Sequence, residues 1–280
     1  MNFKTILVHL DHSQRSAVRA AMAARWSRAH ESHLVGLLPT GLYDGVIPAD
    51  AIPTGMTDFI AESADYLRQR AEAVGRAFRQ GIAGAGPLSY EVRLVDGVTA
   101  DAVVRFGRAS DLLVLGQSYA DEGLDTTVRG LPEQVLMEVG RPVLVVPSAG
   151  AFDAMPENIV VAWDGSREAA VALQAALPAL RRAAGVTLVS LRRPRDEDEA
   201  QQRLMPEVIQ YLLRHGVQAR TEAQVTEIDI ADALLSRISD LGADLLVIGG
   251  YGHSRLRERV LGGVTRQILA QMTVPVLIAH

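Results

Sequence analysis

The sequence of 280 residues contains no cysteine and almost no lysine. Without cysteine the chain can form no disulfide, no catalytic thiolate and no thiolate zinc site, so only histidine and carboxylates remain as strong metal ligands. Lys4 is the single lysine, and every other basic residue is arginine. This composition argues against Schiff-base chemistry and against a phosphate-binding loop of the Gly-Lys-Ser/Thr type.

Long apolar runs and an excess of basic charge are also missing. No stretch approaches the ~18 uninterrupted apolar residues that a membrane-spanning helix needs, and the N-terminus reaches Asp11 too early for a secretory signal. The 28 basic and 33 acidic residues are shared evenly between the two halves, so neither half offers the positive surface that nucleic-acid binding requires. We therefore expect a cytoplasmic protein that contacts neither membranes nor nucleic acid.

Two copies of one sequence pattern make up the chain. The first matching pair is offset by 153 residues and the two later pairs by 133, so the first copy is 20 residues longer than the second. Self-similarity of this kind predicts a repeated structural unit. The matching segments are 6–13 with 159–166, 111–116 with 244–249, and 141–146 with 274–279.

The repeat predicts two tandem domains. We place the first at 1–147, a short linker rich in Ser, Ala, Gly and Pro at 148–157, and the second at 158–280. The extra length of the first copy falls in a segment rich in Pro, Gly and Asp, 38–59, which we predict to be a long loop. A loop of this length near the ends of strands could act as a lid over a ligand.

Short apolar runs alternate with longer helical patterns in both copies. This alternation is typical of βαβ units, and strands that are apolar throughout fit a sheet covered on both faces. We predict an α/β fold of two tandem doubly wound domains, each with a five-stranded parallel sheet flanked by helices. The predicted strands lie near 4–10, 33–38, 89–95, 111–116 and 142–147, and near 158–163, 186–191, 217–225, 244–249 and 274–279.

The last predicted strand of each copy is apolar and begins beside a proline, Pro142 or Pro275. Proline is tolerated at the start of a strand or at a sheet edge, where its missing N–H is not needed. An apolar edge must be covered to prevent unwanted association. We therefore expect strands 143–146 and 276–278 to pair with each other within the chain, or with a second chain in a homodimer.

A glycine-rich segment follows the fourth predicted strand of the second copy. Glycines at 249, 252, 262 and 263 flank an excursion of nine residues and precede a predicted helix. Because glycine has no Cβ, backbone N–H groups can approach an anion there, and the helix start adds unpaired donors. Ligands of open parallel sheets bind at the carboxyl ends of strands. The segment therefore predicts a phosphate-binding site.

In these features the sequence resembles the universal stress protein family, as a tandem of two such domains. The resemblance rests on a first strand that ends in Asp and Ser, on the Gly-x2-Gly-x9-Gly spacing, and on the final Pro-Val-Leu-Ile/Val strand. It implies a stress-response regulatory protein that binds ATP or a related adenine nucleotide, with or without magnesium, and that dimerises through its last strand. The nucleotide-binding residues that it implies are Asp164, Gly249, Gly252, Gly262, Gly263, Val264 and Thr265.

The sequence departs from the family pattern in both copies. The family places Ser or Thr where this chain has Gly263, so one hydroxyl contact to phosphate is missing unless Thr265 replaces it. In the first copy Gly116 keeps the first glycine, but Tyr119 and Arg129 replace the next two. Their side chains would fill the space for phosphate, and we expect no nucleotide in the first domain.

Each candidate site residue also has a structural interpretation. Asp11 and Asp164 both precede a Ser by two residues at a strand-to-helix junction, where such side chains cap helices. The glycines could serve only a tight turn and close helix packing. The histidine pairs His9/His12 and His30/His33 lack accompanying carboxylates at metal-binding spacing, so we expect no metal site.

The sequence contains no recognisable catalytic set. A Ser-His-Asp order, a HExxH motif and a lysine-bearing phosphate loop are all missing, so we expect at most slow, incidental ATP hydrolysis. The main hypothesis is a regulatory protein with one adenine-nucleotide site in its C-terminal domain. One alternative is a nucleotide-independent interaction or oligomerisation protein with an unidentified protein partner. A small-ligand enzyme on the same fold is a third possibility.

Overall fold

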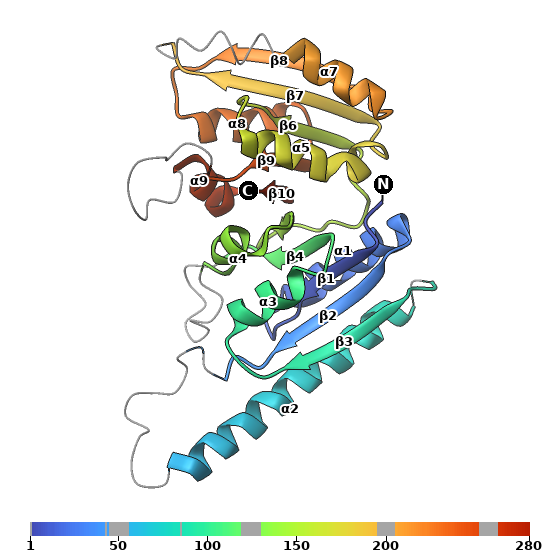
Figure 1. Cartoon of the computed structure of the whole chain (residues 1–280), viewed down its shortest axis with the longest axis vertical. Helices are drawn as coiled ribbons and strands as arrows, with labels where there is room; N and C mark the ends of the chain where they lie inside the picture. Colours follow the sequence, from blue (N-terminus) through green and yellow to red (C-terminus); the bar gives the residue numbers. More distant parts are fainter. Residues whose placement is uncertain are drawn as a thin grey trace. The chain divides into compact units, whose positions relative to one another are not determined.

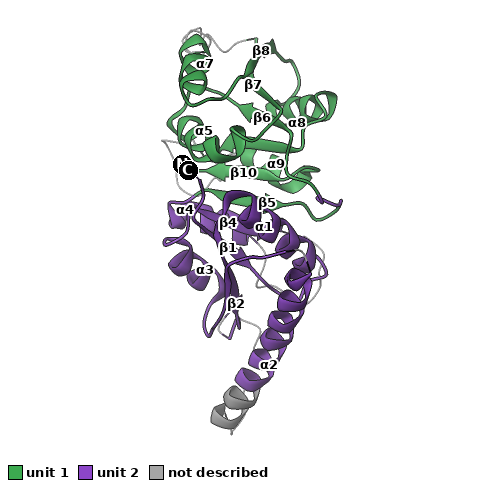
Figure 2. Ribbon diagram, turned by 90° about the vertical axis from the view of Figure 1, so that its right-hand side faces the viewer, with its two compact units in different colours: residues 1, 142–149, 154–280 green, residues 2–141, 150–153 purple. Residues whose placement is uncertain are grey.

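A computed structural model describes residues 2–42, 44, 56–84, 86–118, 130–194, 205–251 and 263–280, with the backbone alone at 56–62. The chain divides into two compact units (Figure 2). The N-terminal unit consists of Asn2–Arg141 with Gly150–Asp153, and the C-terminal unit contains Pro142–Ala149 and Ala154–His280. The last strand of the first repeat therefore belongs to the C-terminal unit.

The described part of the N-terminal unit contains four parallel strands in the order β3-β2-β1-β4. Strands β1, β2 and β4 are almost entirely buried, because they are apolar and helices cover both of their faces. Strand β3 lies at the edge and is half exposed. The bounds are β1 Thr5–His9, β2 His33–Pro39, β3 Tyr90–Val95 and β4 Leu112–Gly116.

Two pairs of helices flank this sheet. Helix α1 packs beside α2 and α3 packs beside α4, and the two pairs lie on opposite sides of the strands (Figure 2). The predicted loop 38–59 is shorter than expected at both ends, because β2 continues through Pro39 and α2 begins at Met56. Residues 43 and 45–55 of that loop lie outside the described residues. The helices are α1 Ser16–His30, α2 Met56–Ala83, α3 Thr99–Gly107 and α4 Leu131–Val139.

The C-terminal unit has the strand order β5-β10-β9-β6-β7-β8 in its described part. The order from β10 to β8 can be followed in Figure 1, and β5 is labelled in Figure 2. The neighbours from β10 to β8 are parallel, and β5 is antiparallel to β10. The strands are β5 Val143–Val146, β6 Asn158–Ala162, β7 Gly185–Arg192, β8 Arg220–Val225, β9 Leu245–Gly249 and β10 Val276–Ala279. The helices are α5 Arg167–Leu180, α7 Met205–Arg214, α8 Ile230–Asp240 and α9 Gly263–Gln271.

The pairing of β5 with β10 joins the last strands of the two repeats. Leu277 lies opposite Leu144 and Val276 lies opposite Val145. All residues of both strands are buried. The antiparallel pairing thereby covers an apolar edge of β10 that would otherwise expose backbone donors and acceptors.

The predicted fold class is confirmed, because both units are helix-flanked α/β structures with largely parallel sheets. Each predicted strand falls within three residues of an observed one. No helix in the described residues is long and apolar enough to cross a membrane.

Candidate functional site

The carboxyl end of β6 turns into α5 through Asp164, Gly165 and Ser166. The Asp164 Oδ1 atom accepts hydrogen bonds from the backbone N–H of Ser166 at 3.0 Å and from its hydroxyl at 2.6 Å. The Ser166 hydroxyl oxygen accepts in turn from the Ala169 N–H at 3.1 Å and caps α5. Gly165 has a φ of 74°, which favours glycine in this turn. Ser166 is thus the cap, and Asp164 orients its hydroxyl.

The end of β9 lies against the start of α5. A Cβ atom at Gly249 would stand 2.5 Å from the backbone nitrogen of Ala169 and 2.5 Å from the carbonyl carbon of Glu168. Only glycine fits such a close backbone approach. This contact brings Gly249 to the same edge of the sheet as the Asp164 turn.

The start of α9 is attached to the same edge. Thr265 is 4% exposed, and its hydroxyl oxygen lies 3.4 Å from the backbone nitrogen of Tyr251, which donates to it. Val264 is half-buried, and Gly263 is exposed, with no atom of the described residues within 4 Å of the place where a Cβ would stand. The first turn of α9 can therefore offer backbone N–H groups to an anion.

The structure brings together five of the seven predicted site residues. Asp164, Gly249 and the triplet 263–265 lie at or beside the carboxyl ends of β6 and β9. Gly252 and Gly262 lie outside the described residues. A polar turn, a glycine strand end and an open helix start together form a candidate site for a phosphate-bearing ligand.

Two further residues lie at this edge that the sequence pattern did not predict. Trp163 is 7% exposed, and its indole Nε1 has no hydrogen-bond partner among the described residues. The His280 ring donates from Nδ1 to the Gly250 carbonyl at 2.9 Å and lies edge-on to Tyr251, with ring centroids 6.4 Å apart. The position of Trp163 directly before Asp164 was the available signal, whereas only the fold places His280 there.

The corresponding turn of the N-terminal unit carries an additional ion pair. The Asp11 Oδ1 accepts from the Ser13 N–H at 3.0 Å and from its hydroxyl at 2.6 Å, as in the second repeat. The Asp11 Oδ2 lies 2.8 Å from Arg19 Nη2, and Arg19 Nε donates to the His9 carbonyl at 2.7 Å. Arg19 is 3% exposed, whereas the second repeat has Ala172 at this position.

This buried cluster changes the acidity of Asp11. Burial raises the pKa of Asp11, but the Arg19 guanidinium, His9 and the hydrogen bonds from Ser13 together lower it further, so the pKa lies well below its usual range. A Cβ atom at Gly116 would collide with Arg19 Nη1. Arg19 thus fills the space at the end of β4. The predicted blocking residues Tyr119 and Arg129 lie outside the described residues.

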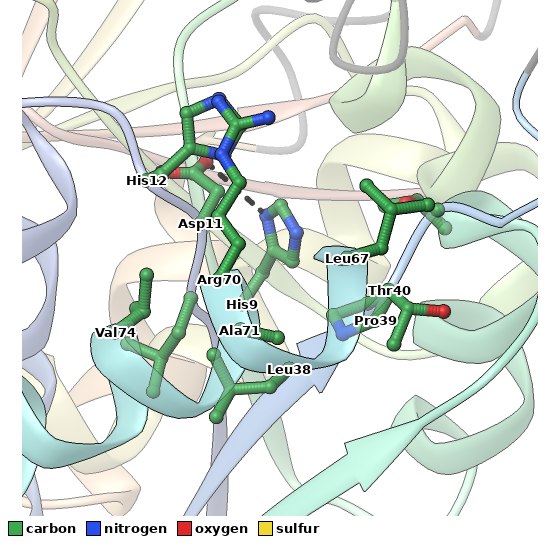
Figure 3. Close-up of a pocket in the computed structure, with 13 residues that line it drawn as sticks. His9, Asp11, His12, Leu38, Pro39, Thr40, Leu67, Arg70, Ala71 and Val74 are labelled. Atoms are coloured by element: carbon green, nitrogen blue, oxygen red, sulfur yellow. Dashed lines mark ion pairs between the residues drawn. The ribbon is translucent and has the colours of Figure 1, made fainter. Parts of the chain in front are cut away.

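A small cavity remains beside this cluster. Its volume is about 60 Å³, far below the roughly 300–1,000 Å³ of typical ligand pockets. Figure 3 draws the close approach of His9 Nδ1 to Asp11 Oδ2, 3.8 Å, at its wall. Residues from the ends of β1 and β2 and from α2, among them Leu10, Thr40 and Arg70, line the rest. The described part of the N-terminal unit therefore offers room for a few water molecules at this edge.

Neither unit shows a metal site in its described residues. No group of three or more His, Asp or Glu side chains there could hold a metal ion.

Comparison with known proteins agrees with this architecture. A sequence model of the Universal stress protein family matches residues 155–280. Residues 155–280 belong to the universal stress protein family. The predicted family is thereby confirmed. A universal stress protein from Synechocystis is 25% identical over 228 residues, which cover 79% of this chain and 76% of the relative.

Two solved structures share the fold along nearly the whole chain. A universal stress protein from Archaeoglobus fulgidus superposes with a TM-score of 0.72 at 18% identity, over 98% of this chain and 97% of that one. A putative universal stress protein from Pseudomonas aeruginosa gives a TM-score of 0.60 at 15% identity, over 99% and 93% of the two chains. The universal stress fold thus extends over both repeats.

Proposed function

We propose that this universal stress protein is a regulatory protein whose C-terminal unit binds one ATP, or a related adenine nucleotide, per chain. The observation that carries the proposal is the meeting of three separate elements at one sheet edge. The Asp164 turn, the end of β9 at Gly249 and the start of α9 come from distant parts of the sequence. The family resemblance supplies the expectation that the nucleotide is an adenine nucleotide.

The phosphates would lie at the first turn of α9. Unpaired N–H groups and the positive end of the helix dipole favour an anion there. Gly263 presents no side chain, and the described part of the chain leaves the space beside its α-carbon free. Because no hydroxyl is present at this position, we expect ATP to bind more weakly than it would with Ser there.

A pair of substitutions at Gly263 tests this site without disturbing its packing. Gly263→Ser restores a donor for phosphate, and a hydrogen bond to a charged group of about 1.5 kcal/mol corresponds to roughly tenfold tighter ATP binding. Gly263→Glu places a negative charge at the same position, and it should weaken ATP binding at least tenfold because the charge repels the phosphates. Titration calorimetry with magnesium and ATP measures both. Equal affinity of wild type, Ser and Glu variants would refute the proposed phosphate position.

A nucleotide-independent interaction protein is the second candidate function. It is favoured by the structural tasks that the predicted site residues perform: Asp164 orients a helix cap, Gly249 allows α5 to pack, and Thr265 binds the Tyr251 N–H. Under this alternative the wild type binds no ATP at millimolar concentration, although these residues remain necessary for folding. The same calorimetric titration therefore separates the two candidates.

A further inference from the structure

Strand β3 forms an edge of the sheet in the N-terminal unit (Figure 1). It pairs with β2 on one side, and no described strand pairs with its other side. Two large apolar side chains are exposed along it, because Tyr90 and Leu94 are both 40% exposed. An unpaired strand of this kind is a template for pairing with another strand. This edge of the sheet can therefore accept a further strand.

The backbone groups of alternate β3 residues point away from β2. The Thr40 N–H donates to the Val95 carbonyl at 2.9 Å, so Val95 faces β2. The hydrogen-bonding groups of successive residues in a strand point to opposite sides, so every second residue back from Val95 also faces β2. The N–H and C=O groups that point to the other side are those of Tyr90, Val92 and Leu94.

These three residues restrict how a second copy of β3 can pair with the first. A copy related by a two-fold axis perpendicular to the sheet runs antiparallel, and its outward residues must lie opposite outward residues to form hydrogen bonds. Only the register centred on Val92 pairs all three. In that register Tyr90 lies opposite Leu94 of the second copy, and the two Val92 residues lie opposite each other.

The same register also matches the charges. It places Glu91 of each copy opposite Arg93 of the other in non-hydrogen-bonded pairs, in which side chains approach most closely. Within one chain Arg93 Nη2 lies 2.6 Å from Glu91 Oε1. The two neighbouring registers would place Glu91 opposite Glu91 or Arg93 opposite Arg93, and like charges directly opposite are destabilising. Backbone pairing and charge therefore select one register.

The face of β3 that packs on α2 has room for the second copy. The Tyr90 ring lies edge-on to Phe78 of α2, with ring centroids 6.1 Å apart. A groove of about 290 Å³ lies beside it between α2 and β3, and Gly75, Val92 and Leu94 are among the residues that line it. Tyr90 of the second copy would lie against Leu94 at the rim of this groove. The contact would cover both exposed apolar side chains.

The equivalent edge strand of the C-terminal unit, β8, does not match itself in this way. Its register that pairs three outward residues is centred on Ala223. This register places Glu222 opposite Gln224. Glu222 Oε2 already accepts a hydrogen bond from Nε of Arg237 in its own chain, at 3.1 Å. Strand β8 would therefore gain no ion pair from a second copy.

We propose that two copies of this chain associate through β3 and join their sheets in an antiparallel homodimer. Each copy supplies one Glu91 and one Arg93, so two equivalent ion pairs flank the two-fold axis at Val92. An interface of this symmetry closes on itself, and association stops at the dimer. The inference does not depend on the nucleotide site.

Analytical ultracentrifugation of the full chain tests this interface. We expect the wild type to reach twice the chain mass of 30.1 kDa as its concentration rises. Glu91→Arg and Arg93→Glu each place like charges opposite each other at two positions, and each variant alone should dimerise at least about tenfold more weakly. An equimolar mixture of the two variants should recover the dimer, because every charge then lies opposite its counterpart.

The matched control is Arg220→Glu, which reverses an exposed charge on β8 and should leave the dimer unchanged. A wild type that stays monomeric at its highest soluble concentration overturns the proposal. A dimer that tolerates both charge reversals, or that Arg220→Glu weakens equally, also overturns it, because the interface then lies elsewhere. Single variants that stay monomeric when mixed overturn it too, since their loss of association is then a structural effect.

Discussion

Among single residues, Arg19 and Asp11 form a buried ion pair that stabilises the N-terminal unit. Arg19 is buried, pairs with Asp11 Oδ2 and holds the His9 carbonyl. Removing one partner of a buried pair leaves an uncompensated charge, which typically costs about 3–5 kcal/mol. The chain therefore relies on an ion pair at the place where the second repeat has the small residue Ala172.

We predict that Arg19→Met lowers the free energy of unfolding of the N-terminal unit by about 3–5 kcal/mol. Denaturant unfolding followed by Trp26 fluorescence, in a Trp163→Phe background, reports on this unit alone. The matched control is Arg68→Met, which removes an exposed ion pair with Asp96 and should destabilise the unit far less, because solvent screens an exposed pair. Similar losses of unfolding free energy in the two variants would show that the buried Arg19–Asp11 pair stabilises the protein no more than an exposed pair does.

The low pKa of Asp11 predicts a dependence of stability on pH. Because the folded-state pKa lies below the unfolded value of about 3.9, the stabilisation is complete above that pH and is lost as pH falls towards the folded pKa. Asp11→Asn should remove up to about 1.4 kcal/mol per pH unit from the slope of unfolding free energy below pH 4. Denaturant unfolding of the two proteins between pH 2.5 and 7 measures this. Identical slopes below pH 4 would contradict the assignment.

The sequence predicted part of this chemistry. The Asp-x-Ser spacing indicated the turns at Asp11 and Asp164, because short polar side chains accept hydrogen bonds from a helix start. It did not indicate that Arg19 is buried, since arginine is usually exposed and its partner is known only from the fold. The orphan N–H of Trp163 is likewise visible only once burial is known.

Among strands and helices, β9 packs so closely against α5 that Gly249 has no room for a side chain, unlike Gly263. Gly249 lies where a Cβ would meet backbone atoms at 2.5 Å, whereas Gly263 has open space. We predict that Gly249→Ala destabilises the C-terminal unit by at least about 1–3 kcal/mol, as overpacking does. Gly263→Ala should change stability by less than about 1 kcal/mol. Thermal unfolding of the two variants decides, and equal effects would contradict the close approach of β9 to α5.

Strands and helices were the best predicted features of the chain. Apolar β-branched runs located β1 to β10 within a few residues, because buried parallel strands are apolar on both faces. The loop at 38–59 was predicted too long, since β2 and α2 extend into it at either end. The repeat placed residues 142–147 in the first domain, whereas the pairing with β10, one of the two pairings expected for this apolar strand, assigns β5 to the C-terminal unit.

Across the chain, the two repeats share a fold but differ at their strand-end sites. The N-terminal unit fills this place with Arg19 and retains a cavity of about 60 Å³ in its described part. In the C-terminal unit no other described residue lies within 4 Å of the Cβ position of Gly263 at the start of α9. The two repeats thus use the same sheet edge differently. In the first, Arg19 fills the strand-end site, and in the second we propose that a ligand binds there.

The number of ATP molecules bound per chain tests this account most directly. Titration calorimetry of the wild type with ATP and magnesium should give one site per chain, and Gly263→Glu should weaken it while Arg19→Met should not. Two sites per chain would contradict the claim that Arg19 fills the corresponding site of the N-terminal unit. No binding at millimolar ATP would contradict the nucleotide site and favour the interaction protein.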